Sequence, residues 1–237
     1  MELLGRYKNG NFKTIILSDG TKIRETEDDE FVPAFAENMD IKICNFCDMG
    51  CPFCHEGSTT DGKFGDILNE KFINTLHPYQ EVALGGGDAT SHPDLIPFLQ
   101  KLKDRKIIVN MTVNQIHFEK KQELIRKLVN EKLIYGLGVS LVNPTEKFIE
   151  LIKKYPNAVI HVINGVLKPS DVEALENNDL KMLILGSQKC AYNIKEEKNK
   201  TLDEVLKACD IECGLYSGDV KNLTRHVLMR VLDRLRE

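Results

Sequence analysis

Three closely spaced cysteines constrain this chain more than any other feature of its sequence. Cys47, Cys51 and Cys54 lie in one short stretch, separated by three and then by two residues. Thiolates this close together can converge on a single metal centre, but three are one fewer than a closed tetrahedral site or a fully ligated iron–sulfur cubane requires. The spacing therefore predicts a metal centre that these cysteines hold with one coordination position left open.

Other kinds of cysteine site fit the stretch less well. If Cys44 is included, the run becomes two Cys-x-x-Cys pairs, but zinc ribbons put roughly 15 to 20 residues between such pairs. The bacterial ferredoxin run has another order of intervals and ends with a proline, which does not follow Cys54. Seven cysteines, an odd number, and no secretory segment argue against disulfides. We therefore predict an iron–sulfur site, with zinc as the alternative, and interpret Cys44 as a core residue that ends an apolar strand.

Composition and charge narrow the class of protein. The 237 residues are 42% hydrophobic, which is enough for one larger domain with a packed core. No segment reaches the roughly 18 uninterrupted apolar residues of a membrane span, and no apolar signal core opens the chain. A net charge of −4 lacks the basic excess that a phosphate backbone requires. We expect a soluble cytoplasmic protein, and neither a membrane nor a nucleic acid is indicated as a partner.

From residue 39 onwards, strand-like and helix-like segments alternate. Strands are predicted at 39–43, 81–84, 107–113, 136–141, 158–163 and 181–185, and helices at 66–76, 94–104, 119–131, 144–155 and 169–176. We expect Asp66 to cap the first helix. Strand–helix units of this kind form parallel sheets, because each crossover must return on the same side. The predicted fold class is α/β.

Three regions follow from this pattern. A partial (βα)6 barrel of parallel strands is predicted over residues 39–186. A β-hairpin and a lead-in segment occupy residues 1–38, and a loop with helices occupies 187–237. The hairpin is marked by a strand-like run at 12–17 and a turn at 18–20.

Polar residues and glycines gather at the carboxyl ends of the predicted strands. After the cysteine loop, these ends carry Gly85 to Asp88, then Asn114, Ser140 and Asn164. Ligands of α/β barrels and open parallel sheets bind at this edge. The sequence thus predicts a site for a polar, charged cofactor, although a hydrogen bond within its own turn is the alternative for each single residue.

The stretch Gly85-Gly86-Gly87-Asp88-Ala89-Thr90 forms a second motif. It comes about thirty residues after the cysteines, and its glycines let the backbone approach a ligand closely. No lysine follows these glycines as it would in a phosphate-binding loop. Together with Phe53 directly before Cys54, the cysteine spacing and this motif resemble those of the radical S-adenosylmethionine (SAM) enzymes.

The resemblance implies that Cys47, Cys51 and Cys54 hold a 4Fe–4S cluster whose fourth iron binds the amino and carboxylate groups of SAM. The SAM contacts that it implies are Phe53, Gly85, Gly86, Gly87, Asp88, Asn114, Ser140 and Asn164. The usual glycine motif continues with Glu and Pro where this chain has Asp88 and Ala89, so the carboxylate has a shorter reach here.

The resemblance also implies an activity. A reduced cluster would cleave SAM to methionine and a 5′-deoxyadenosyl radical, which takes a hydrogen atom from a substrate, with flavodoxin or ferredoxin as the electron donor. Such an enzyme would be an oxidoreductase or a lyase.

The substrate and the catalytic residues stay open. The size is similar to that of the glycyl-radical activating enzymes and of the 7-carboxy-7-deazaguanine synthases, so a small molecule and a protein are both candidates. Cys190, Cys209 and Cys213 are too irregularly spaced to indicate an auxiliary cluster. The competing hypothesis is a non-catalytic zinc or iron–sulfur module for structure or electron transfer.

Overall fold

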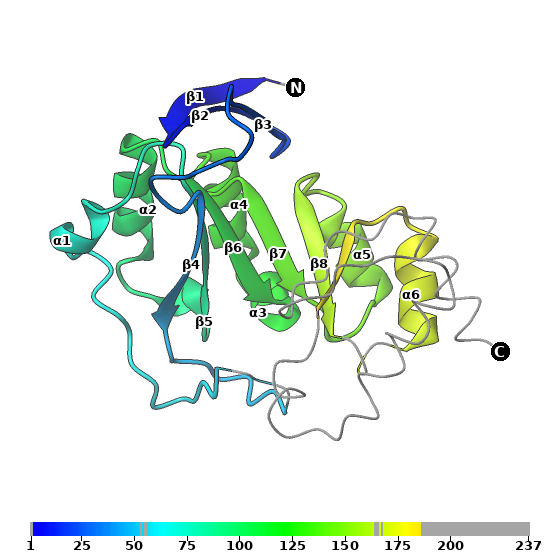
Figure 1. The fold of residues 1–237 in the computed structure, drawn as a ribbon. Helices are drawn as coiled ribbons and strands as arrows, with labels where there is room; N and C mark the ends of the chain where they lie inside the picture. Colours follow the sequence, from blue (N-terminus) through cyan, green and yellow to red (C-terminus); the bar gives the residue numbers. More distant parts are fainter. Residues whose placement is uncertain (1, 53, 55, 164–165, 167, 186–237) are drawn as a thin grey trace, which may run out of the picture.

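Six parallel strands form the centre of the part of the chain that the structure describes (Figure 1). The computed structural model describes residues 2–52, 54, 56–163, 166 and 168–185. In their order across the sheet, which is also their order in the chain, the strands are β4 (Asn38–Cys44), β5 (Glu81–Gly86), β6 (Ile108–Asn114), β7 (Gly136–Ser140), β8 (Ala158–Ile163) and β9 (Met182–Leu185). Every neighbouring pair is parallel. The predicted α/β fold with six parallel strands is confirmed.

Helices connect the strands and cover one face of the sheet (Figure 1). They are α1 (Glu70–Ile73), α2 (Leu95–Asp104), α3 (Gln115–Lys120), α4 (Gln122–Asn130), α5 (Glu146–Ile152) and α6 (Pro169–Glu176), with a short 3-10 helix η1 (Ala89–Ser91) before α2. In β6, Val109, Met111 and Val113 are buried in the core with the apolar helix residues. Asn110 and Thr112, which point the other way, are only half-buried. The face away from the helices is therefore the accessible one.

Three local features differ from the sequence predictions. Asn69, not Asp66, caps α1, because the Asn69 side chain accepts the backbone N–H of Lys71 (3.0 Å) while Asp66 bonds to the Asn69 amide. The single helix predicted at 119–131 is two helices, because α3 begins directly after β6 and the chain bends at Lys121. The predicted hairpin is joined by an additional strand, β1.

The N-terminal strands form a separate antiparallel sheet with the order β1 (Leu3–Asn9), β2 (Phe12–Leu17) and β3 (Lys22–Glu25). It lies at the end of the central strands opposite to the cysteine loop (Figure 1). Glu37, just before β4, connects it to the central sheet. The Glu37 carboxylate accepts hydrogen bonds from the hydroxyls of Tyr7 (2.5 Å) and Thr14 (3.1 Å) and from Nε of Arg24 (2.7 Å).

Within the described ranges, no helix is long and apolar enough to cross a membrane. The C-terminal segment 187–237, for which a loop and helices are predicted, lies outside the described residues.

Replacing Glu37 by alanine tests the connection between the two sheets. Loss of the carboxylate leaves its partly buried donors without a partner, so we expect Glu37→Ala to lower the free energy of unfolding by about 1–3 kcal/mol. Urea denaturation measures this change. The exposed Glu25 on β3 is the control, and Glu25→Ala should change stability by less than about 0.5 kcal/mol. Equal stabilities of the two variants would show that Glu37 does not hold the N-terminal sheet.

Candidate metal and cofactor site

The cysteine loop leaves β4 and folds back on itself. Backbone hydrogen bonds join its two halves: the N–H of Asn45 donates to the carbonyl of Lys63 (2.8 Å), and the N–H of Cys47 donates to the carbonyl of Thr59 (2.9 Å). The loop is thus closed at its base, and it lies at the carboxyl ends of the central strands (Figure 1).

His92, for which the sequence predicts no role, fastens the returning half of this loop. Its Nδ1 accepts the N–H of Asp94 (3.1 Å), so Nε2 carries the proton and donates to the carbonyl of Gly65 (2.9 Å). The buried imidazole also packs edge-on against Phe64, with 5.2 Å between the ring centroids. These contacts fix the loop against the segment that follows the glycine motif.

The glycine motif packs directly on the start of the cysteine loop. The N–H of Gly87 donates to the carbonyl of Cys44 (2.9 Å), and the N–H of Asp88 donates to the carbonyl of Phe46 (2.6 Å). A Cβ on Gly87 would lie 2.1 Å from that Phe46 oxygen. Gly86 has a φ of +112° and would bring a Cβ to 2.3 Å from the Cys44 oxygen. These two glycines are required by the close approach of two backbones.

The three predicted ligand cysteines lie near one another. Burial raises the pKa of the Cys47 and Cys51 thiols, and neighbouring cysteines raise both further, Cys51 acting on Cys47 and Cys54 acting on Cys51. Ionising all of these sulfurs together requires a positive charge among them. A bound metal supplies that charge, because a coordinating thiol is deprotonated by the ion.

The separation of the possible ligand atoms bears on which metal could bind. Among the described residues, Cys47, Asp48 and His117 are the group whose ligand atoms all lie within 4.8 Å of one another, so the three thiols do not all lie that close together. Thiolates on one tetrahedral zinc ion, at about 2.3 Å from the metal, would be about 4 Å apart. Wider spacing suits a cluster, in which each thiolate binds a different iron. Cys44 is buried, and its thiol lies 3.8 Å from the carbonyl oxygen of Phe46.

Asp88 is buried and engaged by neighbouring groups. Its carboxylate accepts hydrogen bonds from the N–H and the hydroxyl of Thr90, the hydroxyl of Ser91 (2.5 Å) and the ammonium of Lys121 (2.7 Å). Burial alone would raise the pKa of Asp88, but the hydrogen bonds from Lys121, Ser91 and Thr90 outweigh it and lower the pKa. The acidic side chain is therefore a fixed anion, and its contact with SAM stays a prediction.

His117, on α3, connects the cysteine loop to the glycine motif. It is 2% exposed, its Nε2 lies 2.6 Å from Oδ1 of Asp48, and its Nδ1 lies 3.5 Å from Oδ1 of Asp88. Asp48 follows Cys47 directly in the sequence. Sequence reasoning missed this bridge, because neither the loop nor the helix carries a signal that pairs them.

Asn114, the last residue of β6, lies beside the cysteine loop. Its side-chain Oδ1 accepts the N–H of Ile116 (2.8 Å) and so caps α3, while its Nδ2 lies 3.9 Å from Sγ of Cys51. The structure thus brings this predicted cofactor residue beside a predicted metal ligand.

Ser140 is the register neighbour of Asn114 on β7, and His161 is the register neighbour of Ser140 on β8. The three side chains therefore share the accessible face of the sheet. Phe53 and Asn164, the remaining predicted SAM contacts, lie outside the described residues.

Gly138 makes room for polar groups on the same face. A Cβ there would lie 2.5 Å from Cε1 of His161 and 2.8 Å from the hydroxyl oxygen of Thr112. Burial lowers the pKa of His161, so its imidazole is neutral near pH 7 and offers one donor and one acceptor. The face can therefore hydrogen-bond a polar ligand.

The residues fit a 4Fe–4S cluster with SAM. Three soft thiolates are the donor set that such a cluster takes, and a fourth iron is left for another ligand. Among the described residues, and apart from Gly85 and its two chain neighbours, no heavy atom lies within 4 Å of the place that a Cβ on Gly85 would take. This glycine therefore faces open space in which a ligand has room.

Two glycine variants separate packing from ligand contact. Gly87→Ala forces a Cβ against the Phe46 carbonyl, so we expect it to cost about 1–3 kcal/mol of stability and to lower the iron bound after anaerobic reconstitution. The added methyl of Gly85→Ala meets no other described residue, so this variant should leave thermal unfolding and iron content unchanged while weakening SAM binding, measured by equilibrium dialysis. A stable, iron-loaded Gly87→Ala protein would contradict the close approach of the two backbones.

Two His117 variants test the bridge. In His117→Gln, the side-chain amide nitrogen takes the place of Nε2, which faces Asp48. In His117→Asn, the amide nitrogen takes the place of Nδ1, which faces Asp88. The contact with Asp48 is shorter than the contact with Asp88. We therefore expect His117→Gln to keep most of the iron and sulfide bound per chain, and His117→Asn to bind several-fold less of both. Iron, sulfide and the electron paramagnetic resonance (EPR) line shape of the reduced protein measure this. Equal loss in both variants would mean that ring packing, rather than the bond to Asp48, supports the loop.

Comparison with known proteins agrees with these features. The family model of the radical SAM superfamily matches residues 41–230. No curated protein sequence matches the chain.

Solved structures of SuiB from Streptococcus suis are similar in fold. The complex of SuiB with its precursor peptide SuiA has a TM-score of 0.54 and 15% identity, and the match covers 86% of this chain and 52% of that chain. Another SuiB structure has a TM-score of 0.51 and 15% identity, over 76% of this chain and 49% of that chain. SuiB bound to SAM matches with a TM-score of 0.49 and 16% identity, over 76% and 46% of the two chains. The chain thus spans about half the length of SuiB, and at this identity the likeness shows the fold alone.

Proposed function

The chain belongs to the radical SAM superfamily, whose members use a 4Fe–4S cluster and SAM, and on this premise we propose that it cleaves SAM reductively to start radical chemistry on a substrate. The observation that carries the proposal is the set of three neighbouring thiols held against a glycine motif whose first residue faces open space. When bound, the cluster and SAM supply a 5′-deoxyadenosyl radical that takes a hydrogen atom from the substrate.

In this proposal each predicted residue has a defined part. Cys47, Cys51 and Cys54 bind three irons. The backbone of Gly85 to Gly87 meets the amino group of SAM, with the fixed anion of Asp88 behind it supplying negative charge. The remaining SAM contacts that we propose, for its ribose, carboxylate and adenine, are Phe53, Asn114, Ser140 and Asn164.

The protein contributes position and charge rather than the bond-breaking chemistry itself. The closed loop and its bonds to Thr59 and Lys63 hold the sulfurs in place. The Nδ2 group of Asn114 lies 3.9 Å from the Cys51 sulfur, where a hydrogen bond to a ligating sulfur raises the cluster potential. These groups would make electron uptake by the cluster easier.

The substrate belongs to one of two proposed classes, a peptide or a small molecule. SuiB is bound to a precursor peptide in one of the similar structures, but this chain spans only about half of that protein. The accessible face, with Thr112 and His161 beside Gly138, is where we propose that the substrate lies. A flavodoxin or ferredoxin is the proposed electron donor, and the reducing cytoplasm is the proposed location because it keeps thiols reduced.

Anaerobic reconstitution with iron and sulfide tests this function. After reduction with dithionite, we expect SAM to change the EPR signal of the cluster and 5′-deoxyadenosine to form slowly, as chromatography would show. Cys51→Ala should lose the cluster signal and all detectable 5′-deoxyadenosine. Cys44→Ala is the matched control and should keep both, because Cys44 is a buried residue at the end of β4.

Two results would overturn the proposal. Zinc bound in place of iron, or an EPR signal that SAM leaves unchanged, would identify a non-catalytic metal-binding module. Turnover retained in Cys51→Ala would exclude the three-thiolate site itself.

A further inference from the structure

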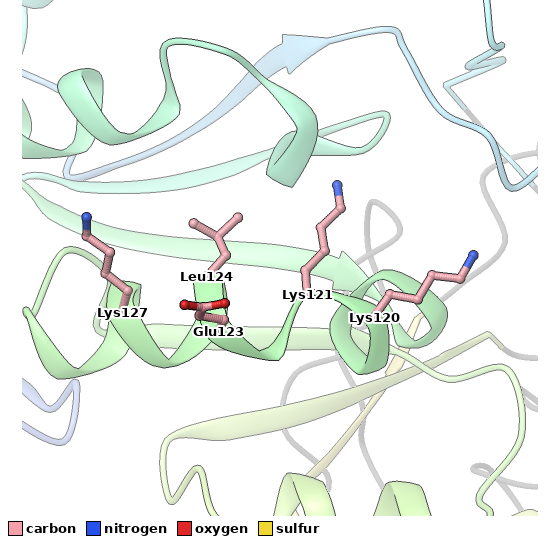
Figure 2. A pocket seen from close by; sticks show the side chains of 5 residues that line it. All are labelled: Lys120, Lys121, Glu123, Leu124 and Lys127. Atoms are coloured by element: carbon pink, nitrogen blue, oxygen red, sulfur yellow. The ribbon is translucent and has the colours of Figure 1, made fainter.

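A groove runs along α3 and α4 on the outer side of the protein (Figure 2). It has a volume of about 540 Å³ and is lined by Lys120, Lys121, Glu123, Leu124 and Lys127. In Figure 2 the side chains of Lys121, Leu124 and Lys127 point to the same side of the helices, and Lys120 extends next to Lys121. We call this surface the basic groove, because it carries three lysines and a single acidic residue.

Two of the three lysines are free to meet a partner. Lys120 and Lys127 are exposed, and within the described part of the chain neither forms an ion pair. Leu124, half-buried between them, adds an apolar contact. With three lysines around one apolar side chain, charge rather than apolar area is the main attraction that this surface offers a partner.

The basic groove lies next to the cysteine loop. The ammonium of Lys121 donates to Asp88 of the glycine motif (2.7 Å). The N–H of Asp88 in turn donates to the carbonyl of Phe46 (2.6 Å) in the cysteine loop. Since Phe46 directly precedes Cys47, a partner in the groove would lie beside the loop that holds the cluster.

The net charge of the whole chain indicates which kind of partner the basic groove would attract. With a net charge of −4, the chain as a whole repels an acidic protein, and a local basic groove attracts and orients it. The sheet separates this groove, on the helix-covered side, from the accessible face where the substrate is proposed to lie. Electrons and substrate would then enter from different sides.

We propose that the basic groove is the docking surface for an acidic one-electron donor protein that reduces the cluster. The proposal rests on the proposed function. In the step that it serves, the donor loses one electron and the cluster gains one, which is the electron that SAM cleavage consumes. An acidic peptide substrate and a nucleic acid are the other possible occupants, and the experiment below separates them.

The test uses the reconstituted protein and the hydroquinone form of a flavodoxin as the donor. Anaerobic stopped-flow absorbance gives the second-order rate constant of flavodoxin oxidation at several salt concentrations, with dithionite as a small reductant for comparison. Lys120→Gln/Lys127→Glu neutralises one free charge of the groove and reverses the other. Lys8→Gln/Lys13→Glu makes the same charge changes on exposed positions of the N-terminal sheet and is the matched control. Lys121 is left intact because it binds Asp88.

For the groove variant we expect the rate constant with flavodoxin to fall about tenfold at low salt. The difference from the unmodified protein should vanish near 1 M salt, where screening acts within about 3 Å. The control variant should change by less than twofold, and dithionite-driven formation of 5′-deoxyadenosine should be the same in all proteins. Glu123→Lys, which adds positive charge to the groove, should raise the rate.

Several outcomes would overturn this proposal. Equal effects of the groove and control variants would mean that net charge alone governs the encounter. If the groove variant reacts with flavodoxin at an unchanged rate but binds an acidic peptide or an oligonucleotide more weakly, the groove binds that peptide or nucleic acid and not the electron donor. If the unmodified protein forms no 5′-deoxyadenosine with dithionite, the proposed function itself fails and this inference falls with it.

Discussion

The close contact between two backbones at the ends of β4 and β5 is the constraint on which the candidate site depends. Gly87 and Asp88 donate to the carbonyls of Cys44 and Phe46, so the cysteine loop and the glycine motif form one unit. Side chains at Gly86 or Gly87 would collide with those carbonyls. The main chain therefore positions the site before any ligand binds, and preorganised positions of this kind avoid an ordering cost at the moment of reaction.

Charge is distributed around this unit in pairs. Asp88 forms an ion pair with Lys121, and Asp48 lies against the imidazole of His117, which also faces Asp88. An anion without such partners would be costly to bury and would disfavour electron uptake nearby. Beyond these contacts, the exposed Lys120 and Lys127 of the basic groove form no ion pair within the described part of the chain. Together they give an acidic chain a basic approach to its reactive loop.

Sequence reasoning was successful where the signal is local. The strand at residues 158–163 and the helix at 169–176 have the predicted bounds, because alternating and helical apolar patterns decide them. Asn114 and Ser140 lie at the carboxyl ends of their strands as predicted, and the structure places Asn114 beside Cys51.

The features that sequence reasoning missed depend on residues far apart in the chain. At the break between α3 and α4, the Lys121 side chain donates a hydrogen bond to Asp88. The His117 side chain contacts Asp48, which lies 69 residues away in the sequence. Strand β1 pairs with β2 although it contains Gly5, which leaves room for the ring of Tyr79. Tertiary contacts override local preference at such positions, and no spacing rule reveals them.

The position of the N-terminal sheet has a practical consequence. Strands β1 to β3 lie at the end of the molecule away from the cysteine loop (Figure 1), and Glu37 clamps them to the scaffold. An affinity tag, a fluorophore or a linker to an electrode attached at Leu3, an exposed residue, would hold the molecule by its chemically inert end. Immobilised in this orientation, the protein would present its metal loop to solution, ready for voltammetry on a single oriented layer.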